Sequence, residues 1–491
     1  MTTPGSAFWW RFTHQALQGV LQFATAIALA RLLTPEDFGV AAIALVVVGF
    51  ASTVYETGVV HAIVQKLELS AAEVVGATVL AITSGVGCTV VVLATAGPLA
   101  SALGQPAADA PLRTLSVIFV IEGLGVVPDA LLQRSLDFRA LFRIELASYL
   151  FGYAAIGVLL AAHGLGFWAL VWAAVAQAIV RTALLTIAVP PTRYWSRIHP
   201  AVSHMLRFAT GSTLGRVFNY FALNLDYLVT SVTSGTQALG LYTRAYQLMI
   251  LPTAQWSSVM EALLLPLLSR VQAVPDELRR LYRQSLSGTG VVVLPALALL
   301  ALSADDVVVG LFGEQWSGAV APLRVLCLAG VCRAGYAVAD VLTVSTGVVY
   351  RRAARQAVYA LLVGVFAAIG SRWGITGVAW GVTFAVGAMW ALLSSLVRSM
   401  TGDGLRAAAR CFLPGFSLSA LALALGVGAR AFCGHFGIGH VASALLVGLI
   451  WLLVAGGYLV TARDGLVADF RSDFLSIGVR TEPERDSGRV G

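Results

Sequence analysis

The feature that most constrains this chain is a succession of continuous apolar runs, each about twenty residues long, that repeats along most of its length. Of its 491 residues, 58% are apolar and only 12% are charged, whereas a soluble protein carries roughly 25% charged residues. The natural solvent for most of the chain is therefore a bilayer. The runs show no period-two alternation, so they predict helices rather than the strands of a membrane barrel.

Runs bounded by charge, Gly or Pro predict about fourteen transmembrane helices. We expect them to centre near Gln22, Val48, Val86, Glu122, Ala155, Ala176, Tyr220, Gln255, Ala298, Gly330, Leu361, Ala385, Leu421 and Leu452. The predicted fold class is an all-α polytopic membrane protein.

Arginines gather in every second connection from the fourth predicted helix onward, and the alternate connections carry one arginine or none. This positive-inside pattern predicts an even helix count, with both termini in the cytoplasm. The net charge of +7 then indicates contact with a membrane surface, and we expect no nucleic-acid partner. The basic connections begin with Arg134, Arg139 and Arg143, and continue with Arg193, Arg197, Arg207, Arg270, Arg279, Arg280, Arg283, Arg351, Arg352, Arg355, Arg398, Arg406 and Arg410.

Other sequence features predict that the chain has no metal, no cofactor, no cleavable signal peptide and no soluble domain. The five cysteines are scattered through apolar segments without metal-ligand spacing, so we expect no metal and no cofactor. No basic leader with a small-residue cleavage site is evident, so we expect no cleavable signal peptide. The connections are short and leave no room for a soluble domain. The tail, residues 466–491, is polar, and we expect it to be cytoplasmic and disordered.

Two pairs of similar segments indicate an internal duplication. TPEDFGVAAIAL contains Gly39 and TQALGLYTRAYQL contains Gly240; GLGFWALVWA, from Gly164, pairs with WGITGVAWG, from Trp373. Both pairs lie about two hundred residues apart. We therefore predict a six-helix N-terminal lobe (1–190), a six-helix C-terminal lobe (191–400) and two additional helices (401–465). Two such lobes enclose a central cleft suited to alternating access.

Polar residues on the first, second, seventh and eighth predicted helices predict what lines this cleft, and the second helix places Ser52 and Glu56 on one side. Gln18 and Gln22 share one face of the first helix, Arg216 and Asn219 one face of the seventh, and Arg244 and Gln247 one face of the eighth. Arg216 lies about nine residues, or roughly 14 Å, beyond Arg207, near the middle of the bilayer, where an arginine costs roughly 2.5–3.5 kcal/mol. We expect Arg216→Ala to impair transport without preventing membrane insertion.

The predicted substrate-binding residues are Arg216, Asn219, Arg244, Gln247, Gln18, Gln22 and Arg31, and the predicted coupling carboxylates are Glu56 and Asp226. Arginines suit an anionic substrate, and amides suit sugar hydroxyls. The alternative for the amides is hydrogen bonding between helices, and for Arg31 and Arg244 a place at the outer interface. Glu56 and Asp340 are alternatively partners of Arg324 and Arg333, and we expect Asp305 and Asp306 to be solvated charge in an outer connection.

Five segments resemble the polysaccharide transporter family, the O-antigen and exopolysaccharide flippases of the multidrug/oligosaccharidyl-lipid/polysaccharide exporter superfamily. They are ARLLTPEDFGV (30–40), DALLQRSLDFRALFRIE (129–145), GLGFWALVW (164–172), LDYLVTSVTSGTQALGLYTRAYQL (225–248) and LLLPLLSRVQ (263–272). The resemblance implies two six-helix lobes and translocation of an undecaprenyl-diphosphate-linked oligosaccharide across the bacterial cytoplasmic membrane. The implied partners are that lipid-linked substrate, the bilayer, and a polysaccharide polymerase or chain-length protein. The family has no strict catalytic motif, so the predicted site residues rest on polar periodicity.

Three alternatives stay open at this point. A drug exporter of the same superfamily would share the fold but favours acidic residues in its cleft. A peptidoglycan-precursor flippase would share the helix number and the cationic cavity. A membrane enzyme, such as a polysaccharide polymerase or a lipid-dependent glycosyltransferase, usually needs a sizeable outer loop or a cytosolic domain, and the sequence shows neither. We therefore expect a transporter and not an enzyme.

Overall fold

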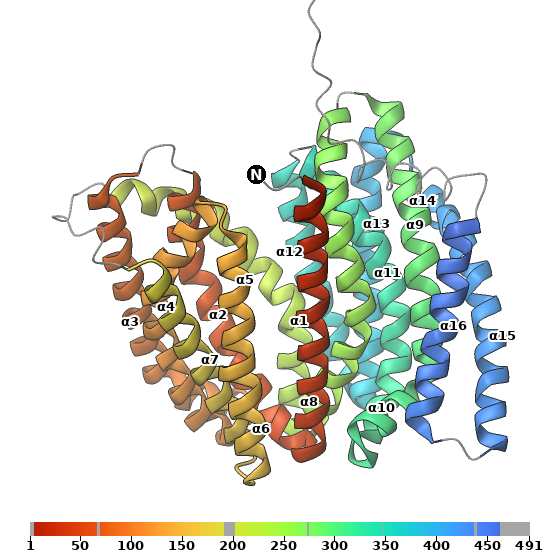
Figure 1. Cartoon of the computed structure of the whole chain (residues 1–491), viewed down its shortest axis with the longest axis horizontal. Helices are drawn as coiled ribbons and strands as arrows, with labels where there is room; N and C mark the ends of the chain where they lie inside the picture. The colour runs from red at the N-terminus through yellow and green to blue at the C-terminus, as the bar shows by residue number, and fades with distance from the viewer. Residues whose placement is uncertain are drawn as a thin grey trace, which may run out of the picture.

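The computed structural model describes residues 4–65, 69–190, 202–272, 274–346, 348–436 and 439–461, and within them every regular element is a helix (Figure 1). The first half contains α1 (Pro4–Leu32), α2 (Pro35–Gln65), α3 (Ala71–Ala102), η1 (Pro106–Ala108), α4 (Asp109–Arg134), α5 (Phe138–Ala147), η2 (Ser148–Ala154), α6 (Ala155–Ala162) and α7 (Phe167–Ala188). The second half contains α8 (Val202–Val271), α9 (Pro275–Leu302), α10 (Ala304–Phe312), η4 (Glu314–Ala319), α11 (Val320–Ser345), α12 (Val349–Gly370), η5 (Ser371–Trp373), α13 (Gly374–Thr401), α14 (Leu405–Cys411), α15 (Leu413–His435) and α16 (His440–Thr461).

The predicted all-α membrane fold is confirmed. Nine helical stretches of the described residues are long and apolar enough to cross a membrane, and two shorter apolar ones, Leu17–Leu32 and Ala442–Tyr458, lie at the ends of the chain. Every predicted helix centre lies inside a helix. The number fourteen itself stays a prediction. The tail from 466 onward lies outside the described residues.

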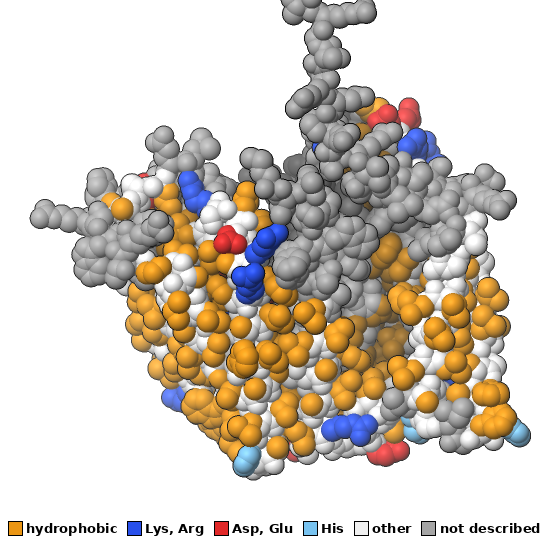
Figure 2. All heavy atoms as spheres, viewed as in Figure 1, with side chains coloured by type: hydrophobic (Ala, Val, Ile, Leu, Met, Phe, Trp, Pro, Cys, Tyr) orange, Lys and Arg blue, Asp and Glu red, His pale blue; other side chains and the backbone are white. Residues whose placement is uncertain are grey.

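Charge and apolar surface are distributed as a bilayer requires. Apolar side chains cover the middle of the face seen in Figure 2, and charged side chains lie toward its two ends. The start of α1 and the end of α16 lie at the same end of the molecule (Figure 1). We call this the terminal end; the opposite end, where α6 and α10 lie, is the far end.

The helices form two groups. One contains α2 to α7 and the other contains the later part of α8 and α9 to α16, with α1 between them (Figure 1). The start of α8 lies beside the first group at the terminal end and runs across to the second. The groups lie close together at the far end and diverge toward the terminal end (Figure 1). The apolar core is divided similarly. One buried cluster is built chiefly on α2, α3, α4 and α7, and a larger one on α8, α9, α11, α12 and α13.

Local sequence signals explain where two of these helices begin. The Thr34 hydroxyl accepts from the backbone N–H of Asp37, and the Asp37 carboxylate accepts from the backbone N–H of Thr34 at 3.0 Å. This reciprocal cap starts α2, and Ser70 and Glu73 form the same arrangement at the start of α3. The TPED of the family-like segment is thus a helix start.

The long helix α8 is two helices joined at a kink. Gly235 has φ 83° and ψ 178°, a conformation that side-chain-bearing residues rarely adopt. We call residues 202–234 arm 8a and residues 236–271 arm 8b. They correspond to the seventh and eighth predicted helices.

The two pairs of similar segments occupy matching positions in the structure. A Cβ on Gly39 of α2 would lie 1.9 Å from the carbonyl oxygen of Thr236, and a Cβ on Gly240 of arm 8b would lie 1.8 Å from that of Pro35. The starts of α2 and arm 8b therefore cross backbone against backbone, each through its own glycine. Gly166 before α7 and Gly374 at the start of α13 also share a positive φ, of 55° and 68°. These matches support the proposed duplication.

Candidate functional site

A cavity of about 550 Å³ lies between the two groups of helices. It is lined by α1, α2, η2, α7, both arms of α8 and the end of α10. Apolar walls come from residues such as Leu29, Leu45 and Leu251. Its polar groups are a guanidinium, amides and hydroxyls. We call it the central cavity.

Arg244 is the dominant charge of the central cavity. It extends from arm 8b, is only 7% exposed, and its guanidinium carbon lies 3.8 Å from the ring centroid of Phe38. One of its nitrogens donates to Oε1 of Gln247 at 2.7 Å. Among the described residues it has no carboxylate within ion-pairing distance. A buried charge normally needs a countercharge, and within the described part of the chain this one is compensated by an amide oxygen and an aromatic ring face.

Aromatic and amide groups complete the wall around Arg244. Tyr149 and Tyr153 of η2 stack with ring centroids 5.4 Å apart and line the cavity. Gln22 of α1 and Asn224 of arm 8a also line it. The Asn224 amide nitrogen donates to the carbonyl of Tyr220, and no described residue donates to its oxygen, which can accept a hydrogen bond.

Three of the predicted substrate-binding residues therefore line one cavity, namely Arg244, Gln247 and Gln22. Two others have protein partners. The Gln18 amide donates to Glu145 at 3.2 Å, and Arg31 donates to the carbonyls of Gly310 and Leu311 at the end of α10. Capping carbonyls at a helix C-terminus is a common use of arginine.

The remaining predicted residues divide into two kinds. The side chains of Arg216, Asn219 and Glu56 lie outside the described ones. Asp226 is 2% exposed and accepts from the Tyr242 hydroxyl at 2.8 Å and from the backbone N–H of Tyr227 at 3.0 Å. It does not line the central cavity.

Polar periodicity missed the aromatic part of the site. Phe38, Tyr149 and Tyr153 frame Arg244, yet each reads as an ordinary apolar helix residue in the sequence. The spacing of Tyr149 and Tyr153 was the one available signal. Both tyrosines lie on the π-helical turn η2, and no local sequence pattern predicts such a turn.

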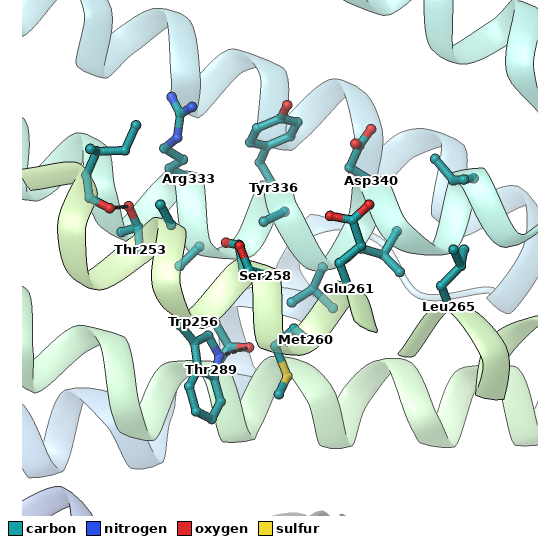
Figure 3. Close-up of a pocket in the computed structure, with 18 of the residues that line it drawn as sticks. Thr253, Trp256, Ser258, Met260, Glu261, Leu265, Thr289, Arg333, Tyr336 and Asp340 are labelled. Atoms are coloured by element: carbon teal, nitrogen blue, oxygen red, sulfur yellow. Dashed lines mark hydrogen bonds between the residues drawn. The ribbon is translucent and has the colours of Figure 1, made fainter. Parts of the chain in front are cut away.

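A second cavity, of about 330 Å³, lies within the second half of the chain between arm 8b, α9, α11 and α12 (Figure 3). Ile250 lines both cavities, so the two are neighbours. The second cavity carries the charged residues Glu261, Arg333, Asp340 and Arg352.

The expected pairing of Asp340 is corrected by the structure. Its partner is Arg352, which donates to both carboxylate oxygens at 2.6 and 2.8 Å, and not Arg324 or Arg333. Arg324 pairs with Asp305. The turn between α11 and α12 brings Asp340 and Arg352 together.

The expectation of solvated charge is wrong for Asp306, while Asp305 is partly exposed and pairs with the exposed Arg324. Asp306 is 6% exposed and receives Nε of Arg430 at 2.9 Å, a ring nitrogen of His440 at 2.7 Å and the hydroxyl of Ser443 at 3.2 Å. This acidic pair lies at the start of α10. Asp306 joins α10 to α15 and α16, because its hydrogen-bond donors lie on those two helices. These donors offset the cost of burying the carboxylate.

Comparison with known proteins agrees with this architecture. The sequence family described as "Polysaccharide biosynthesis protein" matches residues 28–321, more than half of the chain. The chain is 28% identical to the lipopolysaccharide biosynthesis protein WzxC of Escherichia coli (strain K12) over 62% of each chain. It is 30% identical to the succinoglycan biosynthesis transport protein ExoT of Rhizobium meliloti (strain 1021) over 63% of this chain and 62% of that protein. The matched region thus spans less than two thirds of either relative.

Two solved structures show the same fold at low sequence identity. The lipid II flippase MurJ, in an inward closed conformation, superposes with a TM-score of 0.75 at 12% identity, covering 96% of this chain and 99% of that one. An outward-facing multidrug resistance MATE family transporter of the MOP superfamily gives a TM-score of 0.52 at 15% identity, covering 80% and 93%.

Proposed function

The chain belongs to the polysaccharide biosynthesis protein family, and from that premise we propose that it is a flippase for undecaprenyl-diphosphate-linked oligosaccharides. It would move these repeat units from the cytoplasmic to the outer leaflet of the bacterial inner membrane, for the synthesis of O-antigen, capsule or exopolysaccharide. The observation that carries the proposal is Arg244, a buried guanidinium without a carboxylate partner among the described residues, facing a cavity between two groups of membrane helices.

The substrate chemistry fits this cavity. A diphosphate offers only hydrogen-bond acceptors and negative charge, and a guanidinium binds it through parallel charge-assisted hydrogen bonds. The polyprenyl chain is apolar and stays in the bilayer while the head group crosses. The protein therefore needs to shield only the charged and hydroxylated part of the substrate.

The mechanism we propose is alternating access between the N-terminal lobe (1–190) and the C-terminal lobe (191–400), with the helices of 401–465 as additions. The glycine crossing of α2 and arm 8b at the far end is the pivot, because the backbones touch there without intervening side chains. The two groups of helices diverge from this crossing toward the terminal end. The central cavity therefore lies on the terminal side of the crossing. With both termini in the cytoplasm, this conformation would receive substrate from the cytoplasmic leaflet.

Each predicted residue has a place in this mechanism. Arg244, Gln247 and Gln22 would contact the head group directly, and Arg216 and Asn219 of arm 8a would extend that surface. Arg31 would be released for the substrate when the lobes rock, since its present partners lie on α10 in the other lobe. Gln18 would exchange its partner Glu145, which lies in the same lobe, for the substrate. Glu56 and Asp226 would couple transport to a proton or cation. A polysaccharide polymerase or chain-length protein would take the product; nucleic acid has no part, and neither catalysis nor a cofactor is required.

Reconstitution of the purified full-length protein in liposomes tests the proposal. We expect it to move undecaprenyl-diphosphate-linked oligosaccharide, measured by access of an added lectin, and not to move a fluorescent hydrophobic cation. Arg244→Ala should lower the lipid rate at least about tenfold, since it removes a charge-assisted contact. The exposed Arg372→Ala serves as matched control. Transport of the cation but not of the lipid would instead establish a drug exporter.

A further inference from the structure

The second cavity differs from the central cavity in its hydrogen-bonding chemistry. The central cavity offers a guanidinium, amides and tyrosine hydroxyls, but no described carboxylate lines it. The second cavity adds two carboxylates, Glu261 and Asp340, and the hydroxyl groups of Ser258 and Tyr336 (Figure 3). Ile250 of arm 8b lines both cavities, so the two adjoin along this arm.

Two of the four charges in the second cavity neutralise each other. Asp340 and Arg352 form a two-pronged ion pair in which both carboxylate oxygens accept. The other two, Glu261 and Arg333, have no oppositely charged side chain within ion-pairing distance among the described residues. Arg333 donates to the Tyr246 hydroxyl at 3.0 Å, which is its one hydrogen bond within the described part of the chain.

These two groups lie at different levels of the cavity. Arg333 and Asp340 are on the same face of α11, seven residues apart, which corresponds to about 11 Å along the helix. Glu261 extends from arm 8b beside Asp340 (Figure 3). The cavity therefore has a donor-only group at the Arg333 level and an acceptor-only group about two helical turns away.

A diphosphate and a saccharide make opposite demands on such a site. Phosphate oxygens only accept hydrogen bonds and are repelled by carboxylates. Sugar hydroxyls both donate and accept, so they need carboxylates as well as guanidinium groups and hydroxyls. By this criterion the diphosphate belongs in the central cavity and the sugar in the second one, whose volume is in the range of small-molecule sites.

We infer that the second cavity is the saccharide subsite of the transporter, in which Glu261 accepts hydrogen bonds from sugar hydroxyls and Arg333 donates to them. The inference rests on the proposed function, because it assigns the two parts of one lipid-linked substrate to two adjoining cavities. It makes Glu261 and Arg333 residues that select the glycan, while Arg244 holds the diphosphate common to all such substrates.

Binding measurements with two probes separate these roles. The full-length protein in detergent is titrated with undecaprenyl diphosphate, and with undecaprenyl-diphosphate-linked oligosaccharide extracted from cells that carry the protein. We expect Glu261→Gln to weaken binding of the oligosaccharide-bearing probe about tenfold, as one charge-assisted hydrogen bond would, and to leave the glycan-free probe within about twofold. Arg244→Ala should weaken both probes. Glu277→Gln, an exposed carboxylate on the first turn of α9, should change neither.

The outcomes that overturn the inference are distinct. If the unsubstituted protein binds both probes and Glu261→Gln weakens neither, or weakens both equally, the saccharide subsite is refuted while the flippase stands. If the unsubstituted protein binds neither probe, the proposed function fails and the inference fails with it. Because the glycan-free probe reports on the fold of each variant, a misfolded protein cannot imitate the expected result.

Discussion

At the scale of single residues, the central observation is a buried arginine framed by aromatic rings rather than carboxylates. Arg244 stacks on Phe38 and bonds to Gln247. The ring faces give partial compensation for the charge, which leaves the guanidinium hydrogen-bond donors available for a ligand.

This arrangement predicts that the shape of the cation matters as well as its charge. Arg244→Lys keeps the charge but loses the planar fork, so we expect flipping to fall about tenfold, less than with Arg244→Ala. Lectin access in liposomes measures it. Equal rates for Arg244→Lys and the unsubstituted protein would show that the site needs only a point charge.

A second residue-scale prediction concerns Asp403, between α13 and α14. It is 3% exposed and accepts from Arg279 at 2.9 Å and from Arg283 at 2.6 Å. Burial raises the pKa of its carboxyl, but the hydrogen bonds from Arg283 and Arg279 outweigh burial and hold that pKa below the ordinary 3.8. A carboxyl with a depressed folded-state pKa stabilises the fold at pH values above its unfolded-state value, and this stabilisation is lost as the pH falls through the folded-state value.

Asp403→Asn should therefore lower the Tm of the detergent-solubilised protein at pH 7 by several degrees. The difference from the unsubstituted protein should shrink as the pH falls below about 4. Thermal unfolding followed by circular dichroism at both pH values checks this. A difference independent of pH would show that the lost contact is not the ionised one.

At the scale of elements, the decisive contact is the crossing of α2 and arm 8b. An added methyl group at Gly39 or Gly240 would overlap a carbonyl oxygen of the facing helix start. Overpacking of this kind costs about 1–3 kcal/mol and forces the two backbones apart.

We expect Gly39→Ala and Gly240→Ala each to widen the far end and to slow flipping. Spin labels placed on α2 and arm 8b should report a longer distance between these helices. Gly87→Ala is the control, because a Cβ at that position on α3 meets nothing within 4 Å. Unchanged distances and rates in both glycine variants would remove the crossing as the pivot.

The additional helices α15 and α16 are fastened by charge as well as by apolar packing. Asp306 of α10 binds Arg430, His440 and Ser443, which lie on these two helices. Asp306→Asn should lower stability by about 1–3 kcal/mol, since charge-assisted bonds are lost near a partly exposed rim. The midpoint of thermal unfolding, compared with the exposed Asp276→Asn, measures it; equal midpoints would assign the attachment to apolar packing alone.

Much of this architecture follows from the sequence, because long apolar runs leave helices as the way to satisfy the backbone in a bilayer. Partners distant in the chain do not follow. The sequence around Arg31 does not predict that this side chain donates to carbonyls at the end of α10. The sequence around Asp340 does not predict that its partner is Arg352 rather than Arg333. Periodicity identified Arg244 and Gln22 as polar groups of a cleft, but the aromatic frame depends on a π-helical turn and on the packing of α2 against α8.

At the scale of the whole molecule, the structure is a multi-pass membrane protein with two groups of helices and two adjoining cavities between and beside them. In the account proposed here, a lipid-linked saccharide enters from the terminal end and its diphosphate binds Arg244. The lobes then close at the terminal end and open at the far end by pivoting at the glycine crossing. Every step depends on the cargo being an undecaprenyl-diphosphate-linked oligosaccharide that starts in the cytoplasmic leaflet.

The sidedness of that lipid in cells tests this claim most directly. Membrane vesicles of known orientation are prepared from cells lacking the gene, and the leaflet that holds the lipid-linked oligosaccharide is determined with a lectin. We predict accumulation on the cytoplasmic face, reversed by the unsubstituted gene and not by Arg244→Ala. Normal sidedness in the absence of the gene would contradict the account, and unpolymerised units on the outer face would assign the protein to a later step.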